Sequence, residues 1–204
     1  PLQYIAGKMM VVRALVGGLN LIISEPSSTP LAGLERAIDF APMVPMQVAA
    51  TLARPDSAEQ LARVRTLLLG GGFVDPALEA QLQSLPCRVF TSYGMTETLS
   101  HIALRAANGP QRSDRYTPLP GVSVSLSPDG RLQITAPYLN IHNLTTNDLA
   151  EIGEDGTFRI LGRADAVINS GGVKIQAEDI ERALYNQTGL QVVALPLPHP
   201  ALGQ

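Results

Sequence analysis

Residues 87–98 of the chain read Cys87-Arg88-Val89-Phe90-Thr91-Ser92-Tyr93-Gly94-Met95-Thr96-Glu97-Thr98. The first four form a short apolar run that predicts a strand. Apolar residues then recur at helical spacing, at positions 99, 102, 103 and 106, and predict a helix. The polar octet 91–98 is therefore expected where a strand hands over to a helix, in the crevice where open α/β sheets bind ligands.

Four residues of the octet offer chemistry suited to a nucleotide. Tyr93 offers a flat face for a ring, and Gly94 has no Cβ, so a ligand can approach the backbone closely. Thr96 offers a hydroxyl, and Glu97 offers a hard carboxylate oxygen suited to magnesium. A structural alternative is that Thr96 caps the following helix, with Glu97 favoured there by the helix dipole. The octet alone does not decide between the two interpretations.

The composition of the 204-residue chain is that of a globular protein with a real core. A net charge of −3 gives no electrostatic reason to expect nucleic acid or an anionic membrane as a partner. No apolar run reaches the roughly 20 residues that span a bilayer. The single Cys87 excludes an internal disulfide framework and favours a reducing, cytoplasmic compartment. The three histidines lack metal-ligand spacing, which argues against zinc.

Strand and helix signals alternate before the octet. The nearly all-apolar residues 9–16 predict a buried helix, and residues 19–23 a buried strand. Thr29-Pro30 predicts the start of a helix whose apolar face runs to position 41. Further signals predict a short strand at 43–44, a helix over 46–52, a strand over 64–69 and a helix opened by Asp75-Pro76. This alternation predicts an α/β part over residues 1–114, with a mostly parallel layered sheet and helices.

The pattern changes near residue 115. Alternating apolar residues over 122–126 and 132–136 flank the turn Ser127-Pro128-Asp129-Gly130. A second hairpin pairs 149–152 with 157–161, so residues 115–162 are expected to form a small antiparallel β subdomain. From residue 163, a hairpin, a helix ended by Gly189 and a strand over 191–197 predict the start of an α+β domain over 163–204.

Three motifs, in order, resemble those of the acyl-adenylate-forming enzymes (acyl-CoA synthetases, luciferases, adenylation domains). Residues 93–97 resemble the family's Tyr-Gly-x-Thr-Glu motif. Residues 145–148 resemble its Thr-Gly-Asp motif, with Asn147 in place of the glycine, and residues 162–165 resemble its Gly-Arg-x-Asp stretch. The resemblance covers essentially the whole chain and implies ATP, magnesium and CoA as cofactors, with a small carboxylic acid as the partner. It implies that residues 163–204 begin a C-terminal lid.

The resemblance also implies roles for individual residues. Thr96 and Glu97 would be catalytic, and Glu97 would also hold magnesium. The residues expected to bind the nucleotide and CoA are Gly70, Gly71, Gly72, Tyr93, Gly94, Asp148, Arg163, Gly171 and Gly172. Asp148 could accept charge-assisted bonds from both ribose hydroxyls, Gly171 and Gly172 would border the CoA channel, and Asp165 would be the hinge of the lid. The structural alternatives are a flexible glycine turn, an Asx turn at Asp148 and a solvated hairpin and helix.

Residues 4–14 and Ser100 resemble, within this family, the o-succinylbenzoate–CoA ligases of menaquinone synthesis. Tyr4, Lys8, Arg13 and Ser100 are therefore candidates for binding the acid, with Lys8 or Arg13 as the cation for its second carboxylate. These two lie five residues apart, about 140° around a helix, so both are not expected to face one pocket. Snorkelling from a buried helix is the alternative for either.

Together these features predict an ATP-dependent acid–CoA ligase, most similar to the o-succinylbenzoate-specific ones. Another aryl- or fatty-acid–CoA ligase, or a non-catalytic nucleotide-binding fragment, is the alternative. The resemblance implies a phosphate loop before Pro1 and a catalytic lysine after Gln204, which Lys174 does not replace. The chain alone is therefore expected to be inactive. The sequence leaves a homodimer open.

Overall fold

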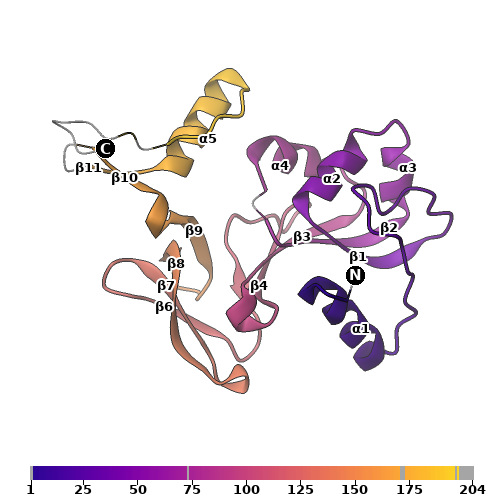
Figure 1. Ribbon diagram of the computed structural model, residues 1–204, viewed down its shortest axis with the longest axis horizontal. Helices are drawn as coiled ribbons and strands as arrows, with labels where there is room; N and C mark the ends of the chain where they lie inside the picture. Colours follow the sequence, from indigo (N-terminus) through magenta and orange to yellow (C-terminus); the bar gives the residue numbers. More distant parts are fainter. Residues whose placement is uncertain (1, 73, 171–172, 196, 198–204) are drawn as a thin grey trace. The chain divides into compact units, whose positions relative to one another are not determined.

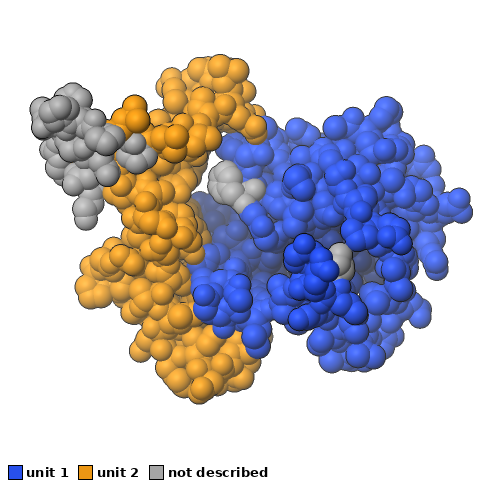
Figure 2. Space-filling view, in the orientation of Figure 1, with its two compact units in different colours: residues 1–116 blue, residues 117–204 orange. Residues whose placement is uncertain are grey.

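The computed structural model describes residues 2–72, 74–170, 173–195 and 197. The chain forms two compact units, residues 1–116 and 117–204 (Figure 1; Figure 2). It is a mixed α/β structure with one sheet that contains parallel strands and smaller antiparallel sheets, as the sequence predicts. The division into 1–114, 115–162 and 163–204 stays a prediction.

The sheet of the first unit holds its strands in the order β1, β2, β3, β4. β1 (Ile38–Met43) is parallel to β2 (Val64–Leu69), and β2 is parallel to β3 (Arg88–Gly94). β4 (His101–Ala106) runs antiparallel to β3. Because β2 and β3 are parallel, Gly70 and the end of β3 lie at the same edge of the sheet, as the sequence indicates.

The helices of the first unit are α1 (Ile5–Gly17), α2 (Pro45–Leu52), α3 (Ser57–Ala62), α4 (Pro76–Leu82) and the short 3-10 helix η1 (Thr96–Thr98). Figure 1 shows α2, α3 and α4 on one side of the sheet. The Asp75 carboxylate accepts a hydrogen bond of 2.9 Å from the backbone N–H of Leu78, so it caps α4 as its sequence predicts. The core between these helices and the sheet includes the fully buried Leu61, Leu67 and Leu82.

The second unit is built around a four-stranded antiparallel sheet in the order β6, β7, β8, β9. The strands are β6 (Ser123–Leu126), β7 (Arg131–Ala136), β8 (Ile141–Ile152) and β9 (Phe158–Arg163). Both predicted hairpins are present, around the turns at 127–130 and 153–157. Phe158, Leu132 and Ile134 are fully buried and form the interior of this unit.

The rest of the second unit is made of short elements and one helix. They are β5 (Thr117–Pro118), η2 (Pro137–Leu139), η3 (Ala164–Ala166), β10 (Val167–Ser170), β11 (Val173–Gln176) and α5 (Ala177–Thr188). β10 and β11 form the predicted antiparallel hairpin, and α5 ends at Gly189, which adopts a left-handed φ of 70°. The predicted strand over 191–197 is wrong for its described residues, 191–195 and 197, which form no strand.

The helix predicted after the octet is wrong, because a strand follows instead. Leu99 has a φ of 61°, a left-handed conformation from which a right-handed helix cannot continue. β4 then pairs with β3 from Gly94–His101 to Phe90–Ala106. The octet therefore spans the end of β3 and the turn of an antiparallel hairpin. The apolar spacing that suggested a helix serves a strand whose Ile102 and Ala103 are both buried.

Three predictions before residue 45 are also corrected. Residues 19–23 form no strand and are exposed. The helix predicted from Thr29-Pro30 is only a turn, because Gly33 takes a φ of +75° one turn later. The segment predicted as the end of that helix is β1, whose ladder with β2 replaces helical hydrogen bonding. The short strand predicted at 43–44 is not a separate element, because Met43 is the last residue of β1 and Val44 lies outside the strand.

The predicted helix at 9–16 is present as α1, but its predicted burial is wrong. α1 has no buried residue, and Leu15 and Val16 are 77% and 84% exposed. An all-apolar helix surface favours burial, but burial also requires elements that cover it. Within the described residues no element covers these two side chains.

Candidate functional site

Three glycines follow β2, and the side chain of Ser92 packs closely against the first of them. A Cβ on Gly70 would lie 2.6 Å from the hydroxyl oxygen of Ser92, which itself donates a 3.0 Å hydrogen bond to the carbonyl of Leu69. Gly71 has a φ of +75°, a conformation that glycine adopts without strain. Gly70 thus lies beside β3, whereas a Cβ on Gly71 would lie 3.6 Å from the side chain of Val44 and a Cβ on Gly72 3.5 Å from that of Pro45.

Gly94 sits at a break in the β3–β4 register. A Cβ on Gly94 would lie 2.5 Å from the carbonyl oxygen of Ser100, a backbone atom that cannot rotate away. Thr98 closes the turn: its buried hydroxyl accepts from the Met95 N–H at 3.0 Å and lies 2.7 Å from the Ser100 carbonyl. The capping threonine of this turn is therefore Thr98, and the alternative role of Thr96 as a helix cap is wrong.

Thr96 and Glu97 are exposed on this turn. The turn that carries them follows β3, which ends at the same edge of the sheet as β2 and Gly70. No group of three histidine, cysteine, aspartate or glutamate residues that could enclose a metal occurs among the described residues. A magnesium ion held by Glu97 would therefore take its other ligands from substrate phosphates and water, an arrangement that is common for this ion.

Tyr93 has an aromatic neighbour that the sequence analysis missed. The ring of Tyr116 lies 5.8 Å from the ring of Tyr93, with 55° between their planes. Arg105 lies 5.6 Å from the Tyr116 ring centroid, in a cation–π contact. No local motif signals this cluster, because β3–β4 pairing and the loop after β4 bring its members together.

Arg13, Ser100 and His101 converge at one point. Arg13 Nη2 lies 3.5 Å and Ser100 Oγ 3.4 Å from Nδ1 of His101. Arg13 also lies 5.7 Å from the ring centroid of Phe40. Burial and the neighbouring Arg13 charge lower the pKa of His101, and burial lowers the pKa of Arg13. The structure thus joins two predicted acid-binding residues, Arg13 and Ser100, through a histidine that the sequence analysis set aside.

The other two predicted acid-binding residues do not join this group. Lys8 is exposed on α1. Tyr4 is 61% exposed and precedes the first residue of α1. Of the two predicted cations, Arg13 is the one half-buried against polar partners. This agrees with the expectation that both do not face one pocket.

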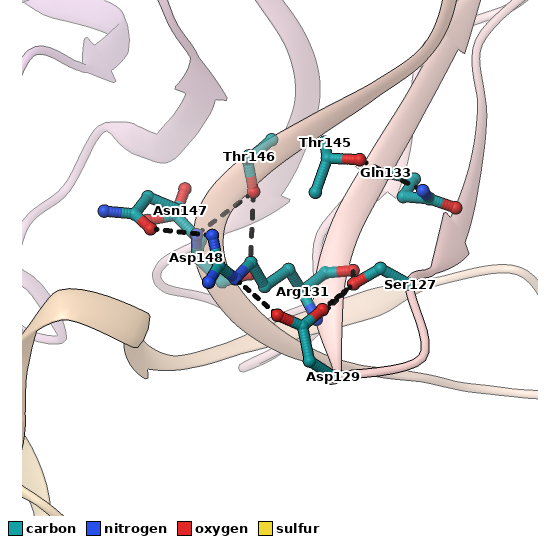
Figure 3. Close-up of polar contacts among 8 residues, drawn as sticks. All are labelled: Ser127, Asp129, Arg131, Gln133, Thr145, Thr146, Asn147 and Asp148. Carbon is teal, nitrogen blue, oxygen red and sulfur yellow. Dashed lines mark hydrogen bonds and ion pairs between the residues drawn. The ribbon is translucent and has the colours of Figure 1, made fainter.

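In the second unit, Asp148 lies within β8 rather than in the Asx turn considered from the sequence. Its backbone N–H donates a 3.1 Å hydrogen bond to the hydroxyl of Thr146 (Figure 3). Arg131 donates to the side chain of Asn147 at 3.4 Å and pairs with Asp129. Figure 3 shows these side chains around the β7–β8 strands. Asn147, the predicted departure from the motif, is therefore held in place by a neighbouring strand.

Arg163 connects two carboxylates. Its Nη1 lies 3.6 Å from Asp148 Oδ1, and its Nε and Nη2 donate to the two oxygens of Asp165 at 3.1 and 3.0 Å. The hydrogen bond from Arg163 lowers the pKa of Asp165, with a further contribution from Asn147. The backbone N–H of Arg163 also donates to Glu178 of α5 at 3.2 Å. The structure thus gathers Asp148, Arg163 and Asp165, while Gly171 and Gly172 lie outside the described residues.

In the described part of the chain, no helix has the length and apolar character needed to cross a membrane.

Comparison with known proteins identifies the family. The sequence profile of the AMP-binding enzyme family matches residues 1–135. The chain belongs to the AMP-binding enzymes. The matched region includes the motif at residues 93–97, whereas the motifs at 145–148 and 162–165 lie outside it.

Proteins similar to the chain include CoA ligases and related synthetases. The chain is 27% identical to 2-succinylbenzoate–CoA ligase of Escherichia coli (strain K12), over 100% of this chain and 46% of that protein. The acyl-CoA synthetase (AMP-forming)/AMP-acid ligase II-like protein of Dyadobacter fermentans is 41% identical, with a TM-score of 0.72, over 98% of this chain and 59% of that one. The structure of E. coli MenE with a bound m-phenylether-linked analogue of OSB-AMS is 26% identical, with a TM-score of 0.75. The match covers 100% of this chain and 47% of the MenE chain. The chain thus spans about half the length of its curated relatives.

Proposed function

We propose that the full-length protein is an ATP-dependent acid–CoA ligase. One observation carries the proposal: in a chain of the AMP-binding family, Thr96 and Glu97 are exposed at the sheet edge that also carries the Gly70 backbone. The hydroxyl, the carboxylate and the bare backbone match the phosphates, magnesium and base of ATP. The names of the relatives support CoA as the acceptor.

The proposed reaction has two steps. In the first, a carboxylate oxygen of the acid attacks the α-phosphate of ATP, and pyrophosphate leaves with the electron pair of the broken P–O bond. In the second, the CoA thiol, which loses its proton, attacks the acyl carbon and displaces AMP. The chain's part in both steps is to position the reactants and to stabilise charge. A magnesium ion at Glu97 would supply charge neutralisation of the phosphates.

Roles in nucleotide binding follow the chemistry of each group. Tyr93 and the glycines 70–72 lie against the base. Gly94 shapes the turn beside Tyr93, because its missing Cβ leaves room for the Ser100 carbonyl. Asp148, only 15% exposed, accepts hydrogen bonds from the ribose hydroxyls, and Arg163 orients it from the neighbouring strand. Gly171 and Gly172 border the CoA channel in this proposal.

We propose o-succinylbenzoate as the acid, because the chain resembles 2-succinylbenzoate–CoA ligases over its whole length. This acid has two carboxylates, so one reacts while the other needs a cation. Arg13 supplies it: Arg13 is half-buried beside Ser100 and His101 and belongs to none of the ion pairs of the described residues. Lys8 and Tyr4 are exposed and do not join this cluster. Another aryl or fatty acid is the alternative substrate.

Asp165 is the proposed hinge of a C-terminal lid. It lies in η3, between β9 and the β10–β11 hairpin, where a change of φ and ψ disturbs no ladder. Proline there would fix φ near −65° and oppose one of two lid orientations. In single turnovers, Asp165→Pro should leave pyrophosphate release largely intact and slow thioester formation from preformed acyl-adenylate by orders of magnitude. Equal losses in both half-reactions would make Asp165 a stability residue.

The full-length protein is expected to work in the cytoplasm, without nucleic acid or membrane partners, and as a monomer or homodimer. The test of the function is pyrophosphate release by the full-length enzyme with ATP, CoA and a panel of carboxylic acids. Release that depends on o-succinylbenzoate supports the proposal, and release with another acid reassigns the substrate. AMP binding without release for any acid would favour a non-catalytic nucleotide-binding protein.

A further inference from the structure

The aromatic pair beside the octet is held by a charged cluster. Arg105 Nη1 donates to the Glu79 carboxylate at 2.9 Å and to the carbonyl of Ser113 at 3.0 Å. The guanidinium lies 5.6 Å from the Tyr116 ring centroid. The side chain of Arg105 is only 11% exposed. One guanidinium therefore connects α4, β4 and the loop that ends at Tyr116.

Burial opposes the charge of this arginine, but its partners overcome that effect. Desolvation lowers the pKa of Arg105, whereas hydrogen bonding to Glu79 and interactions with Tyr116 raise it, and the net shift is upward. A buried, charged and multiply bonded arginine has little freedom to move. It is thus a fixed support for the Tyr116 ring.

The register of the hairpin places this support beside Tyr93. Arg105 is opposite Thr91 and Ala103 is opposite Tyr93, so Arg105 and Tyr93 lie on the same face of the sheet, one diagonal apart. Tyr116 contacts both: its ring is 5.8 Å from that of Tyr93, at 55°, and 5.6 Å from the guanidinium. At 5.8 Å and 55° the two rings form a tilted contact, within the centroid distances at which aromatic pairs attract each other.

We propose that Arg105, through Tyr116, is a positioning residue that sets the orientation of the Tyr93 ring for stacking on the base of an adenine nucleotide. The inference rests on the proposed function, in which Tyr93 lies against that base. Tyr116 contacts the Tyr93 ring at a centroid distance of 5.8 Å and so restricts its rotation. Neither Arg105 nor Tyr116 needs to touch the nucleotide.

The first test measures binding of AMP and of ribose 5-phosphate, which lacks the base, to the full-length protein. Tyr116→Ala should raise the Kd of AMP by about 2- to 10-fold, the range for loss of one aromatic pair, and leave the Kd of ribose 5-phosphate unchanged. Tyr116→Phe should retain most of the affinity. Tyr138→Ala, which removes a 60% exposed tyrosine elsewhere, should change neither. Equal weakening of both ligands, or of neither, would overturn the inference.

The second test needs no nucleotide. The chain has five tyrosines and no tryptophan, so 3-fluorotyrosine labelling gives a small set of ¹⁹F resonances. Arg105→Lys keeps the charge but loses the guanidinium fork, and it should shift the Tyr93 resonance, which Tyr93→Phe assigns. An unchanged Tyr93 resonance would overturn this inference and would leave the proposed function untouched. Failure of the wild-type protein to bind AMP would instead overturn the proposed function, and the stacking role with it.

Discussion

Asp148 and Arg163 face each other across the β8–β9 ladder, with 3.6 Å between Oδ1 and Nη1. The Asp148 side chain is 15% exposed, whereas that of Arg163 is 52% exposed and also holds Asp165. The arginine therefore links the end of the antiparallel sheet to the residue proposed as a hinge. The Asp148 carboxylate thus lies within ion-pair distance of Arg163 before any ligand binds.

The first prediction concerns Asp148→Ala in the full-length enzyme. Loss of charge-assisted hydrogen bonds of about 1.5–3 kcal/mol should weaken ATP use by roughly 10- to 100-fold. The measurement is kcat/KM for ATP at saturating acid and CoA. Glu154→Ala, which removes an exposed carboxylate from the β8–β9 turn, is the matched control and should have no effect. Unchanged kinetics in Asp148→Ala would mean that Asp148 does not bind ATP and that its role is its ion pair with Arg163.

The second prediction separates the two cations of α1. Arg13→Met should lower kcat/KM for o-succinylbenzoate by about 10- to 100-fold, because a charged hydrogen bond to the second carboxylate is lost. Benzoate, which has one carboxylate, should lose far less. Lys8→Met serves as the control, since Lys8 is exposed and should affect neither acid. A loss in Arg13→Met that is equal for both acids would indicate a packing defect near Phe40.

The third prediction is a pH dependence of stability that arises at His101. Burial, and then Arg13, lower its pKa in the folded chain below the ordinary value of 6.5. The unfolded chain therefore takes up a proton first as the pH falls. Stabilisation by neutral His101 is complete above pH 6.5 and is lost as the pH falls from there through the folded pKa.

Urea unfolding of the chain between pH 8 and pH 5 measures this effect. His101→Gln keeps a hydrogen-bond acceptor for Arg13 without a titrating group, so its unfolding free energy should fall less steeply below pH 6.5. His142→Gln, at an exposed histidine of the second unit, is the control. Identical pH profiles for the wild type and His101→Gln would disprove the prediction.

The fourth prediction is that Gly70 and Ser92 are energetically coupled. Gly70→Ala places a Cβ 2.6 Å from the Ser92 hydroxyl oxygen and should destabilise the chain by about 1–3 kcal/mol. Ser92→Ala removes that oxygen and leaves the nearest atom at about 4.0 Å, although it also loses the hydrogen bond to Leu69. A double-mutant cycle should therefore find Gly70→Ala less costly in the Ser92→Ala background. Additive effects would mean that the contact relaxes freely.

Features encoded by adjacent residues were predictable from the sequence. Asp75-Pro76 caps α4, and the turn at 127–130 forms the first hairpin, because these residues act through their own backbone. The shared edge of Gly70 and the octet was also predictable, because consecutive parallel strands end on the same side. Strand order thus made the shared edge of Gly70 and the octet predictable, and turn chemistry made the local caps and hairpins predictable.

Features that depend on distant partners were not predictable. Apolar spacing after the octet fits a helix, and only the left-handed Leu99 and pairing with β3 make it a strand. Arg105 and Tyr116 meet Tyr93 through that same pairing, so no motif could reveal them. The sequence analysis set His101 aside because the histidines lack metal-ligand spacing. Its contact with Arg13 could not be found there, because the two residues lie 88 positions apart in the sequence.

Hydrogen bonds among residues 95–100 close the turn after β3. Thr98 N–H donates to Met95, Leu99 N–H to Thr96, and the Thr98 hydroxyl links Met95 to Ser100, so these hydrogen bonds all lie inside six consecutive residues. A turn of this kind is a self-contained building block. We expect residues 95–100 to keep their shape when grafted between two antiparallel strands of an unrelated scaffold, where they would present a hydroxyl and a carboxylate outward as a portable loop for protein design.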